Sequence, residues 1–327
     1  MSRVAVYGAG AVGGYLAWHL ARAGHSVSVV ARGAHLAAIR EKGLALVAPD
    51  KPRESVRVAA SDDPGALGPQ DIVIVTLKHP GLASAVEGFR QFASVQTQFV
   101  FATNGIPWWM EPDLDLLDPD GRLAAVVAPA MRVGCVVKAS IEVTAPGLVS
   151  MDTPTARFIL GPASIDAERA ALSAVEFLNG AGIQSSFAAD LRPAVWEKLL
   201  LNLGFGLPAA ILGLPVGICA RQPEMQAFLK ELFAEIRLIA RSRGVELTVP
   251  DDIAADPAIL SSPHLPSLLQ DLQRGRAAEI DALVTAPTLL ARRAGLPVPI
   301  LEKMGALVTA KARALGSYDG PGIAGHA

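Results

Sequence analysis

A glycine-rich turn near the start of the chain constrains the fold more than any other feature. Gly8, Gly10 and Gly13 form the pattern G-x-G-x-x-G, between an apolar run over 4–7 and a helix-compatible segment over 15–23. The first glycine permits a tight turn, the second lets a pyrophosphate approach the backbone, and the third lets the helix pack closely on the strand. The helix start also offers N–H groups to phosphate. A turn without a ligand is the alternative, but the context favours a dinucleotide-binding site, with these predicted residues: Gly8, Gly10, Ala11, Val12 and Gly13.

The end of the second predicted strand, over 26–30, indicates which dinucleotide binds. A site for NAD usually carries Asp or Glu there, to hold the ribose 2′-hydroxyl. This chain reads Val30-Ala31-Arg32-Gly33 and has no acid at that point. A guanidinium can hold a 2′-phosphate with two hydrogen bonds, although Arg32 could also be an ordinary solvated arginine. The sequence therefore predicts NADP (NADPH) as the cofactor.

Alternating strand and helix patterns predict a doubly wound sheet in the first half of the chain. Ligands of such sheets bind beyond the carboxyl ends of the strands, where Lys78 and the stretch 102–109 are expected. We predict an α/β protein with an N-terminal Rossmann-like domain, 1–188, followed by an all-α domain, 189–327. The expected strands are 4–7, 26–30, 44–47, 55–60, 71–75, 98–101, 126–127, 133–137, 141–143, 158–160 and 182–187, with the pieces from 126 to 160 extending the sheet. The expected helices of the second half are 190–203, 223–244, 266–295 and 299–315, before a frayed tail at 316–327.

Composition excludes several classes of function. The net charge of −2 and an aromatic content of 5% argue against nucleic acid as a partner. The six histidines lack ligand spacing, so no metal site is predicted, and no G-x-S-x-G elbow indicates a hydrolase. Cys135 and Cys219 stand alone, which is typical of a reduced compartment. Because the first strand begins at once and leaves no room for a signal peptide, we expect a cytoplasmic protein.

One uncharged stretch, 199–220, is long enough to span a bilayer. It contains four glycines and the two prolines Pro208 and Pro215, which would interrupt a single helix. We interpret it as a buried helix followed by a turn, so no membrane association is predicted.

Two groups of polar residues in the second half are candidates for chemistry. Lys198 and Asn202 are four residues apart, which places them on one side of a helix. Partial burial would lower the pKa of Lys198 towards that of a useful general acid, although the amine could instead reach water at a helix end. The second group is 265–281. There Ser267 could be an N-cap, and Asp271, Arg274 and Glu279 could be surface charges.

These residues, taken in order, resemble the ketopantoate reductase (2-dehydropantoate 2-reductase) family of two-domain, NADPH-dependent enzymes. The resemblance covers nearly the whole chain. It rests on the glycine motif at 8–14, Lys78, the Asn104-Gly105 turn, the pair Lys198 and Asn202, and the segment from Ser267 to Glu279.

The resemblance implies a role for each matched residue. Lys198 would protonate the alkoxide that forms as hydride reaches the ketone, and Glu279 would anchor the cofactor and help to position Lys198. Asn104 and Lys78 would lie near the cofactor and the reacting centre. Ser267 would bind the substrate carboxylate, and Asn202 would bind a substrate oxygen. Lys198, Asn104 and Glu279 are therefore the predicted catalytic residues, and a small 2-oxo acid is the expected partner, with a homodimer left open.

The chain also departs from the family pattern. Gly206 stands where a further asparagine is usual, and apolar residues around Val216 replace another. Those asparagines grip the polar substrate, including its hydroxyl, so their loss puts the identity of the substrate in question. Trp108 and Trp109 follow the Asn-Gly turn, and we expect Trp108 to contact a bulkier, more apolar 2-oxo acid, although these rings could simply pack the loop.

Three functions are compared. The first is NADPH-dependent reduction of a 2-oxo acid, with ketopantoate as the default substrate. The second is a paralogous reductase or dehydrogenase for a more apolar keto or hydroxy acid. The third is a non-catalytic NADP-binding sensor, which the retention of Lys198, Asn104, Ser267 and Glu279 disfavours.

Overall fold

The computed structural model describes residues 1–49, 52–153 and 155–326, and the chain forms two compact units. Unit 1 comprises Met1–Thr103 and Asp118–Leu191, and unit 2 comprises Asn104–Leu117 and Arg192–Ala327. The segment Asn104–Leu117 therefore groups with the helices of the second half, which no strand or helix pattern indicated. The domain limits 1–188 and 189–327 stay a prediction.

Unit 1 is built on an eight-stranded sheet with the order β12-β11-β8-β7-β6-β1-β2-β5. Neighbouring strands are parallel, except that β8 and β11 are antiparallel. The chain builds outward from β1 on one side and then continues from β6 on the other, so the topological switch point lies between β1 and β6. This arrangement confirms the predicted doubly wound α/β fold. The strands are β1 (Arg3–Tyr7), β2 (Ser26–Val30), β5 (Ala59–Ser61), β6 (Ile72–Val75), β7 (Gln98–Phe101), β8 (Arg132–Lys138), β11 (Arg157–Pro162) and β12 (Ser185–Phe187).

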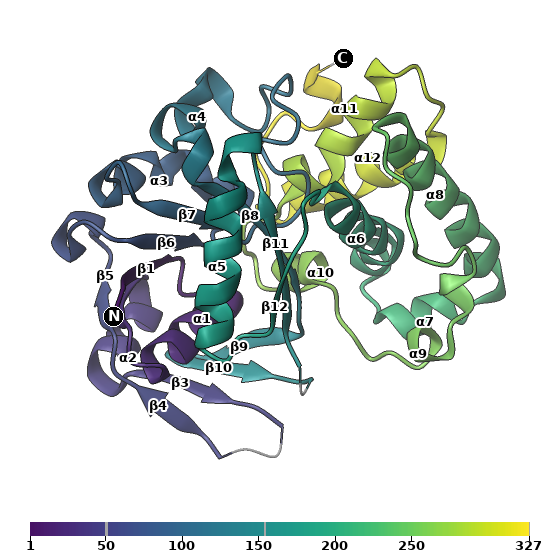
Figure 1. Cartoon of the computed structure of the whole chain (residues 1–327). Coiled ribbons are helices and arrows are strands. Elements are labelled where there is room, and N and C mark those ends of the chain that lie inside the picture. The colour runs from purple at the N-terminus through teal and green to yellow at the C-terminus, as the bar shows by residue number, and fades with distance from the viewer. Residues whose placement is uncertain (50–51, 154, 327) are drawn as a thin grey trace. The chain divides into compact units, whose positions relative to one another are not determined.

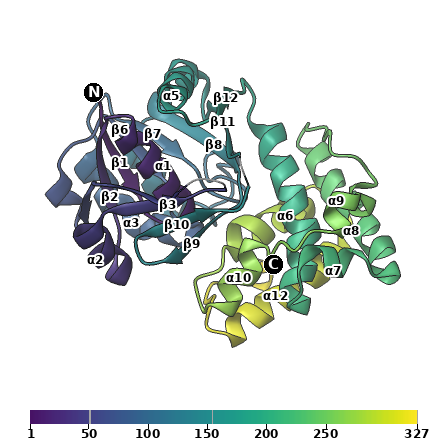
Figure 2. The same ribbon diagram turned by 90° about the horizontal axis from the view of Figure 1, so that it is seen from below.

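Helices cover both faces of this sheet, which explains its continuous apolar strands. All four residues of β6 are buried, as expected for a parallel strand that is covered on both sides. Helix α5 packs along β8, β11 and β12 (Figure 1). Helix α1 packs on β1 and β2 and also contacts a second, smaller sheet (Figure 2). The helices of unit 1 are α1 (Ala11–Arg22), α2 (Gly33–Lys42), α3 (His79–Phe92), α4 (Arg122–Val126) and α5 (Glu168–Gly180).

Three strands that the sequence predicted need correction, two of them because of a second, smaller sheet. Its order is β4-β3-β10-β9, formed by β4 (Glu54–Val56), β3 (Leu44–Val47), β10 (Leu148–Met151) and β9 (Ile141–Ala145). The single strand expected over 55–60 is wrong, because β4 and β5 belong to different sheets. The piece 141–143 extends the smaller sheet and not the main one. The strand expected at 126–127 is also wrong, since Val126 ends α4, and a short apolar run alone does not distinguish strand from helix.

The described part of unit 2 from Arg192 onward is helical, without a strand. This confirms the predicted all-α character of the second half. The helices are α6 (Arg192–Leu212), α7 (Val216–Ala220), α8 (Pro223–Ser242), α9 (Pro257–Leu260), α10 (Ser267–Gln273), a π-helix (Asp281–Thr285), α11 (Ala286–Arg293) and α12 (Pro299–Ala314).

Helix α6 runs further than expected. It continues through Pro208 to Leu212, so the predicted interruption at this proline is wrong. A proline removes one hydrogen bond of the helix, and the burial of every residue over 203–210 offsets that loss. By length and composition α6 could cross a membrane, but 67% of its apolar window is buried within the protein, as in a core helix.

Two further expectations for unit 2 are wrong. The helix expected over 266–295 is divided, because α10 ends at Gln273 and regular structure resumes only near residue 280. The tail expected to fray packs on the unit instead, with Ser317, Tyr318 and Ile323 all buried. Both errors have a tertiary cause, since this tail contacts the segment that follows the break.

Candidate active site

The glycine turn lies at the switch point of the main sheet. Gly8 has a φ of +103°, which favours glycine, and its N–H donates to the carbonyl of Val30 at 3.2 Å. Gly10 is exposed at the N-cap of α1, and a Cβ built on it would have no heavy atom within 4 Å. Ala11 and Val12 form the first turn of α1, where helix N–H groups lack partners within the helix. This open turn suits a pyrophosphate.

Gly13 has a structural role, because a Cβ there would overlap two groups of the turn. These are the carbonyl oxygen of Gly8 and Oγ1 of Thr76. Thr76 follows β6, and its hydroxyl donates to the Gly8 carbonyl at 2.5 Å. Sequence reasoning missed Thr76, although its place directly after a buried strand was a signal that could have found it.

Arg32 and Lys78 each lie just beyond the carboxyl end of a strand of the main sheet. Arg32 is exposed at the N-cap of α2, directly beyond β2. Burial raises the pKa of Tyr7 at the end of β1, and the positive charge of Arg32 opposes part of that rise. Lys78 is half-buried at the N-cap of α3, beyond β6. The carboxyl edge around the turn therefore carries positive charge.

In unit 2, Asn104 and Glu279 are brought together although 175 residues separate them in sequence. The Asn104 amide Nδ2 donates to Oε2 of Glu279 at 3.4 Å. Glu279 is only 5% exposed, so it is not the surface charge that the pattern alone suggested. The backbone supports this approach, because Ile106 N–H donates to the carbonyl of Ala282 at 2.9 Å. Gly105, with a φ of +79°, leaves no room for a Cβ beside the same carbonyl.

Lys198 and Asn202 are both half-buried on α6 and follow one side of the helix. Gly206 continues this side one turn later and is buried, and a Cβ on it would meet only Cβ of Pro266, at 3.8 Å. That side of α6 therefore leads towards the start of α10, whose first residue is Ser267. Of the residues in this unit that are predicted to contact substrate, Lys198, Asn202 and Ser267 thus lie on the adjacent helices α6 and α10.

The segment from Ser267 to Glu279 is more buried than a run of surface charges. Ser267 is exposed and is not the N-cap of α10, because Pro266 holds that position. Asp271 is 3% exposed and its Oδ1 pairs with the Arg276 guanidinium at 3.0 Å. Arg274 is exposed, as the pattern suggested.

The two tryptophans after the Asn-Gly turn pack on each other. The ring of Trp108 is 4% exposed and lies edge-on to that of Trp109, with centroids 5.4 Å apart. Val216, where the family pattern has a polar residue, is buried, and its N–H donates to the carbonyl of His264 at 3.0 Å. A contact of Trp108 with substrate stays a prediction.

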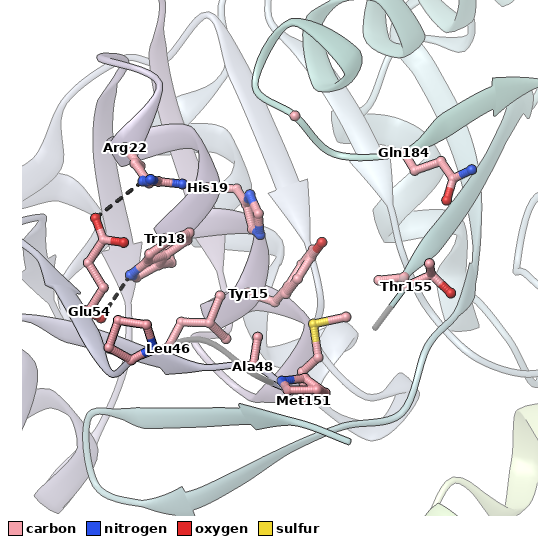
Figure 3. A pocket seen from close by; sticks show the side chains of 14 residues that line it. Tyr15, Trp18, His19, Arg22, Leu46, Ala48, Glu54, Met151, Thr155 and Gln184 are labelled. Atoms are coloured by element: carbon pink, nitrogen blue, oxygen red, sulfur yellow. Dashed lines mark hydrogen bonds and ion pairs between the residues drawn. The ribbon is translucent and has the colours of Figure 1, made fainter. Parts of the chain in front are cut away.

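A separate pocket of about 490 Å³ lies in unit 1, along the outer side of α1. Tyr15, Trp18 and His19 project into it, and Glu54 on β4 pairs with Arg22 at 3.2 Å (Figure 3). No residue of the glycine turn lines this pocket, and neither Arg32 nor Lys78 does. It is therefore distinct from the predicted phosphate site.

Within the described residues, no group of three or more His, Cys, Asp or Glu side chains could hold a metal ion. Cys135 and Cys219 are both buried, and the Cys219 thiol donates to the carbonyl of Leu214 at 3.8 Å.

Comparison with known proteins gives consistent matches over both units. The family model "Ketopantoate reductase PanE/ApbA" matches residues 4–163, and its C-terminal counterpart matches 190–312. The 2-dehydropantoate 2-reductase of Mesorhizobium japonicum is 36% identical over 97% of this chain and 100% of its own length. A crystal structure of a provisionally named ketopantoate reductase from Ralstonia solanacearum is 31% identical, with a TM-score of 0.88, over 97% of this chain and 100% of that one.

A more distant structure shares the fold alone. D-mandelate dehydrogenase, solved with NADH and anilino(oxo)acetate, is 21% identical, with a TM-score of 0.84, over 96% of this chain and 99% of that one.

Proposed function

The chain belongs to the ketopantoate reductase family, and we propose that it reduces a 2-oxo acid with NADPH, by default ketopantoate to pantoate. Family membership makes the protein an oxidoreductase of the 2-dehydropantoate 2-reductase type. The observation that best supports binding of a dinucleotide is the open space at Gly10, which lies on a turn at the switch point of the sheet. The exposed Arg32 beyond β2 supports NADPH over NADH, because it can hold a 2′-phosphate.

Bound NADPH would supply the hydride, and the chain would supply orientation and the proton. We assign to Lys198 the protonation of the substrate oxygen, whose developing negative charge its ammonium would also stabilise. Ser267 would donate to the substrate carboxylate, and Asn202 would bind a substrate oxygen from the same side of α6 as Lys198. Glu279, buried beside Asn104, would hold the cofactor and orient the lysine. Lys78 would bind near the cofactor phosphates.

A second substrate class is favoured by the apolar positions 206 and 216. Gly206 leaves unfilled space against Pro266, and Val216 is buried where the family pattern has a polar side chain. A site without those amides gives a substrate hydroxyl no partner, which favours a 2-oxo acid that lacks it. Ketopantoate and 3,3-dimethyl-2-oxobutanoate differ by that hydroxyl alone. Rates of NADPH oxidation with these two acids decide between the substrates.

Substitution of Lys198 tests the mechanism. We expect Lys198→Ala to lower kcat by about 10²- to 10⁴-fold while the affinity for NADPH is kept, because only the proton donor is lost. Lys230→Ala, which removes an exposed lysine from α8 of the same unit, is the matched control. An unchanged kcat in Lys198→Ala would exclude this lysine as the acid. A wild-type protein that binds NADPH but reduces no 2-oxo acid would instead support a sensor.

A further inference from the structure

The tail of the chain, from Gly316 onward, is hydrogen-bonded to the segment that carries Glu279. The Tyr318 hydroxyl donates to Oδ1 of Asp281 at 2.5 Å, and the Ser317 carbonyl accepts the Ala278 N–H at 2.9 Å. Tyr318 and Ser317 are both buried, with 9% and 4% of their surface exposed. The tail thus binds on both sides of Glu279 in sequence.

Tyr318 makes further contacts through both its hydroxyl group and its ring. The hydroxyl oxygen accepts the N–H of Gly322 at 2.9 Å, while the guanidinium of Arg313 lies over the ring, 5.7 Å from its centroid. Burial, with the hydrogen bond to Asp281, raises the pKa of Tyr318, so the phenol stays protonated and keeps donating. Asp281 also accepts the hydroxyl of Thr285 at 3.2 Å.

Asp281 is the first residue of a π-helix, so the hydrogen bond from Tyr318 is made to the start of this element. Pro287 cannot donate to the carbonyl four residues earlier, and its ring would clash there, which explains the wider turn. The same element presents the carbonyl of Ala282 to Ile106, at 2.9 Å, and so receives the segment that carries Asn104. The π-helix therefore contacts the segment that carries Asn104, and it begins two residues after Glu279.

We propose that Tyr318 is a positioning residue, which acts through Asp281 and the π-helix to keep Glu279 in hydrogen-bonding reach of Asn104. The proposal rests on the function proposed above for that pair. The tail does not touch reactants in this scheme. It fixes the geometry of the two residues that would hold the cofactor and orient Lys198, and a small displacement of such residues is costly for the rate.

Tyr318→Phe tests this, because it keeps the ring and removes only the hydroxyl. We expect kcat to fall about tenfold, with a much smaller change in the KM of the 2-oxo acid. Tyr15→Phe removes a hydroxyl from another buried tyrosine, in unit 1, and is the matched control with wild-type kcat. If Tyr318 acts through Glu279, the effects of Tyr318→Phe and Glu279→Gln are non-additive in the double variant. Additive effects would overturn the proposal.

Amide hydrogen exchange gives a readout that needs no activity. In Tyr318→Phe, but not in Tyr15→Phe, the amides over 104–106 and 278–285 should exchange faster, because the π-helix has lost its anchor. Unchanged exchange there overturns the positioning role. If wild-type protein reduces no 2-oxo acid and exchange still rises, the proposed function fails while the anchoring contact stands.

Discussion

The hydroxyl of Thr76 donates to the carbonyl oxygen of Gly8 at 2.5 Å, so a side chain that follows β6 holds the backbone that follows β1. This bond crosses the switch point of the main sheet, where a doubly wound fold binds its ligand. It fixes the carbonyl against which Gly13 packs. The turn is therefore preorganised by groups that need not touch the cofactor.

Two alanine substitutions in the turn should separate structure from binding. Gly13→Ala would overlap Gly8 and Thr76, and we expect it to lower the free energy of unfolding by about 1–3 kcal/mol. Gly10→Ala meets no neighbour, so it should leave stability unchanged and weaken NADPH at least about tenfold by obstructing the pyrophosphate. Urea unfolding and fluorescence titration with NADPH measure the two effects. Tight NADPH binding by Gly10→Ala would refute the assigned phosphate site.

Arg32→Ala should change the choice of cofactor. Loss of a charge-assisted contact to the 2′-phosphate is expected to raise the Kd of NADPH about 10- to 100-fold and to leave that of NADH nearly unchanged. Arg90→Ala, which removes an exposed arginine that pairs with Glu87 on α3, is the control for lost surface charge. An equal rise in Kd for both cofactors would show that Arg32 does not bind the 2′-phosphate.

The main sheet could be predicted because its signals are local. The strand Ile72–Val75 is continuously apolar and the glycine turn has a fixed spacing, so each reports its own conformation. The division of 55–60 between two sheets could not be predicted, because only tertiary pairing decides it. The packed tail was hidden for the same reason: Tyr318 is stabilised by Asp281 on a distant segment, while its neighbours Gly316 and Gly320 indicate a loose end.

The candidate site shows the same limit. The spacing of Lys198 and Asn202 predicts a shared helix side, since 3.6 residues make one turn. Pattern alone favoured a surface position for Glu279, yet it is buried beside Asn104. The membership of Asn104 in unit 2 has no sequence signal either, because the residue follows a strand of unit 1 by three positions.

His35 makes the stability of unit 1 depend on pH. Its Nδ1 accepts the N–H of Gly147 at 3.0 Å, which joins α2 to the turn between β9 and β10. Burial lowers the pKa of His35 below its ordinary value of 6.5, so folding favours the neutral ring. The contribution of the neutral His35 ring to the free energy of unfolding is complete above pH 6.5, and it is lost as the pH falls through the lowered pKa.

His35→Gln removes this titration. The loss of unfolding free energy between pH 7 and pH 5, measured with urea, should be smaller in His35→Gln than in the wild type. His264→Gln, at an exposed histidine of unit 2, should keep the wild-type difference. An identical pH dependence in His35→Gln would exclude this ring as the source.

Gly206 gives the sharpest test of substrate choice. A Cβ at this buried position meets only Pro266, at 3.8 Å, which is an ordinary van der Waals contact next to the start of α10. Gly206→Asn would restore an amide one turn beyond Asn202. We expect the ratio of kcat/KM for ketopantoate to that for 3,3-dimethyl-2-oxobutanoate to rise about fivefold, since one net hydrogen bond contributes about 1 kcal/mol.

Gly206→Leu is the control for that experiment, because leucine adds similar bulk without a hydrogen-bonding group. Gly206→Leu should lower kcat/KM for both acids or for neither, and so leave the ratio of the two kcat/KM values unchanged. If Gly206→Leu raises the ratio as much as Gly206→Asn does, the added volume and not the amide selects the substrate. If neither variant changes it, position 206 lies outside the site that binds the hydroxyl, and the apolar character around Val216 must explain the choice of substrate instead.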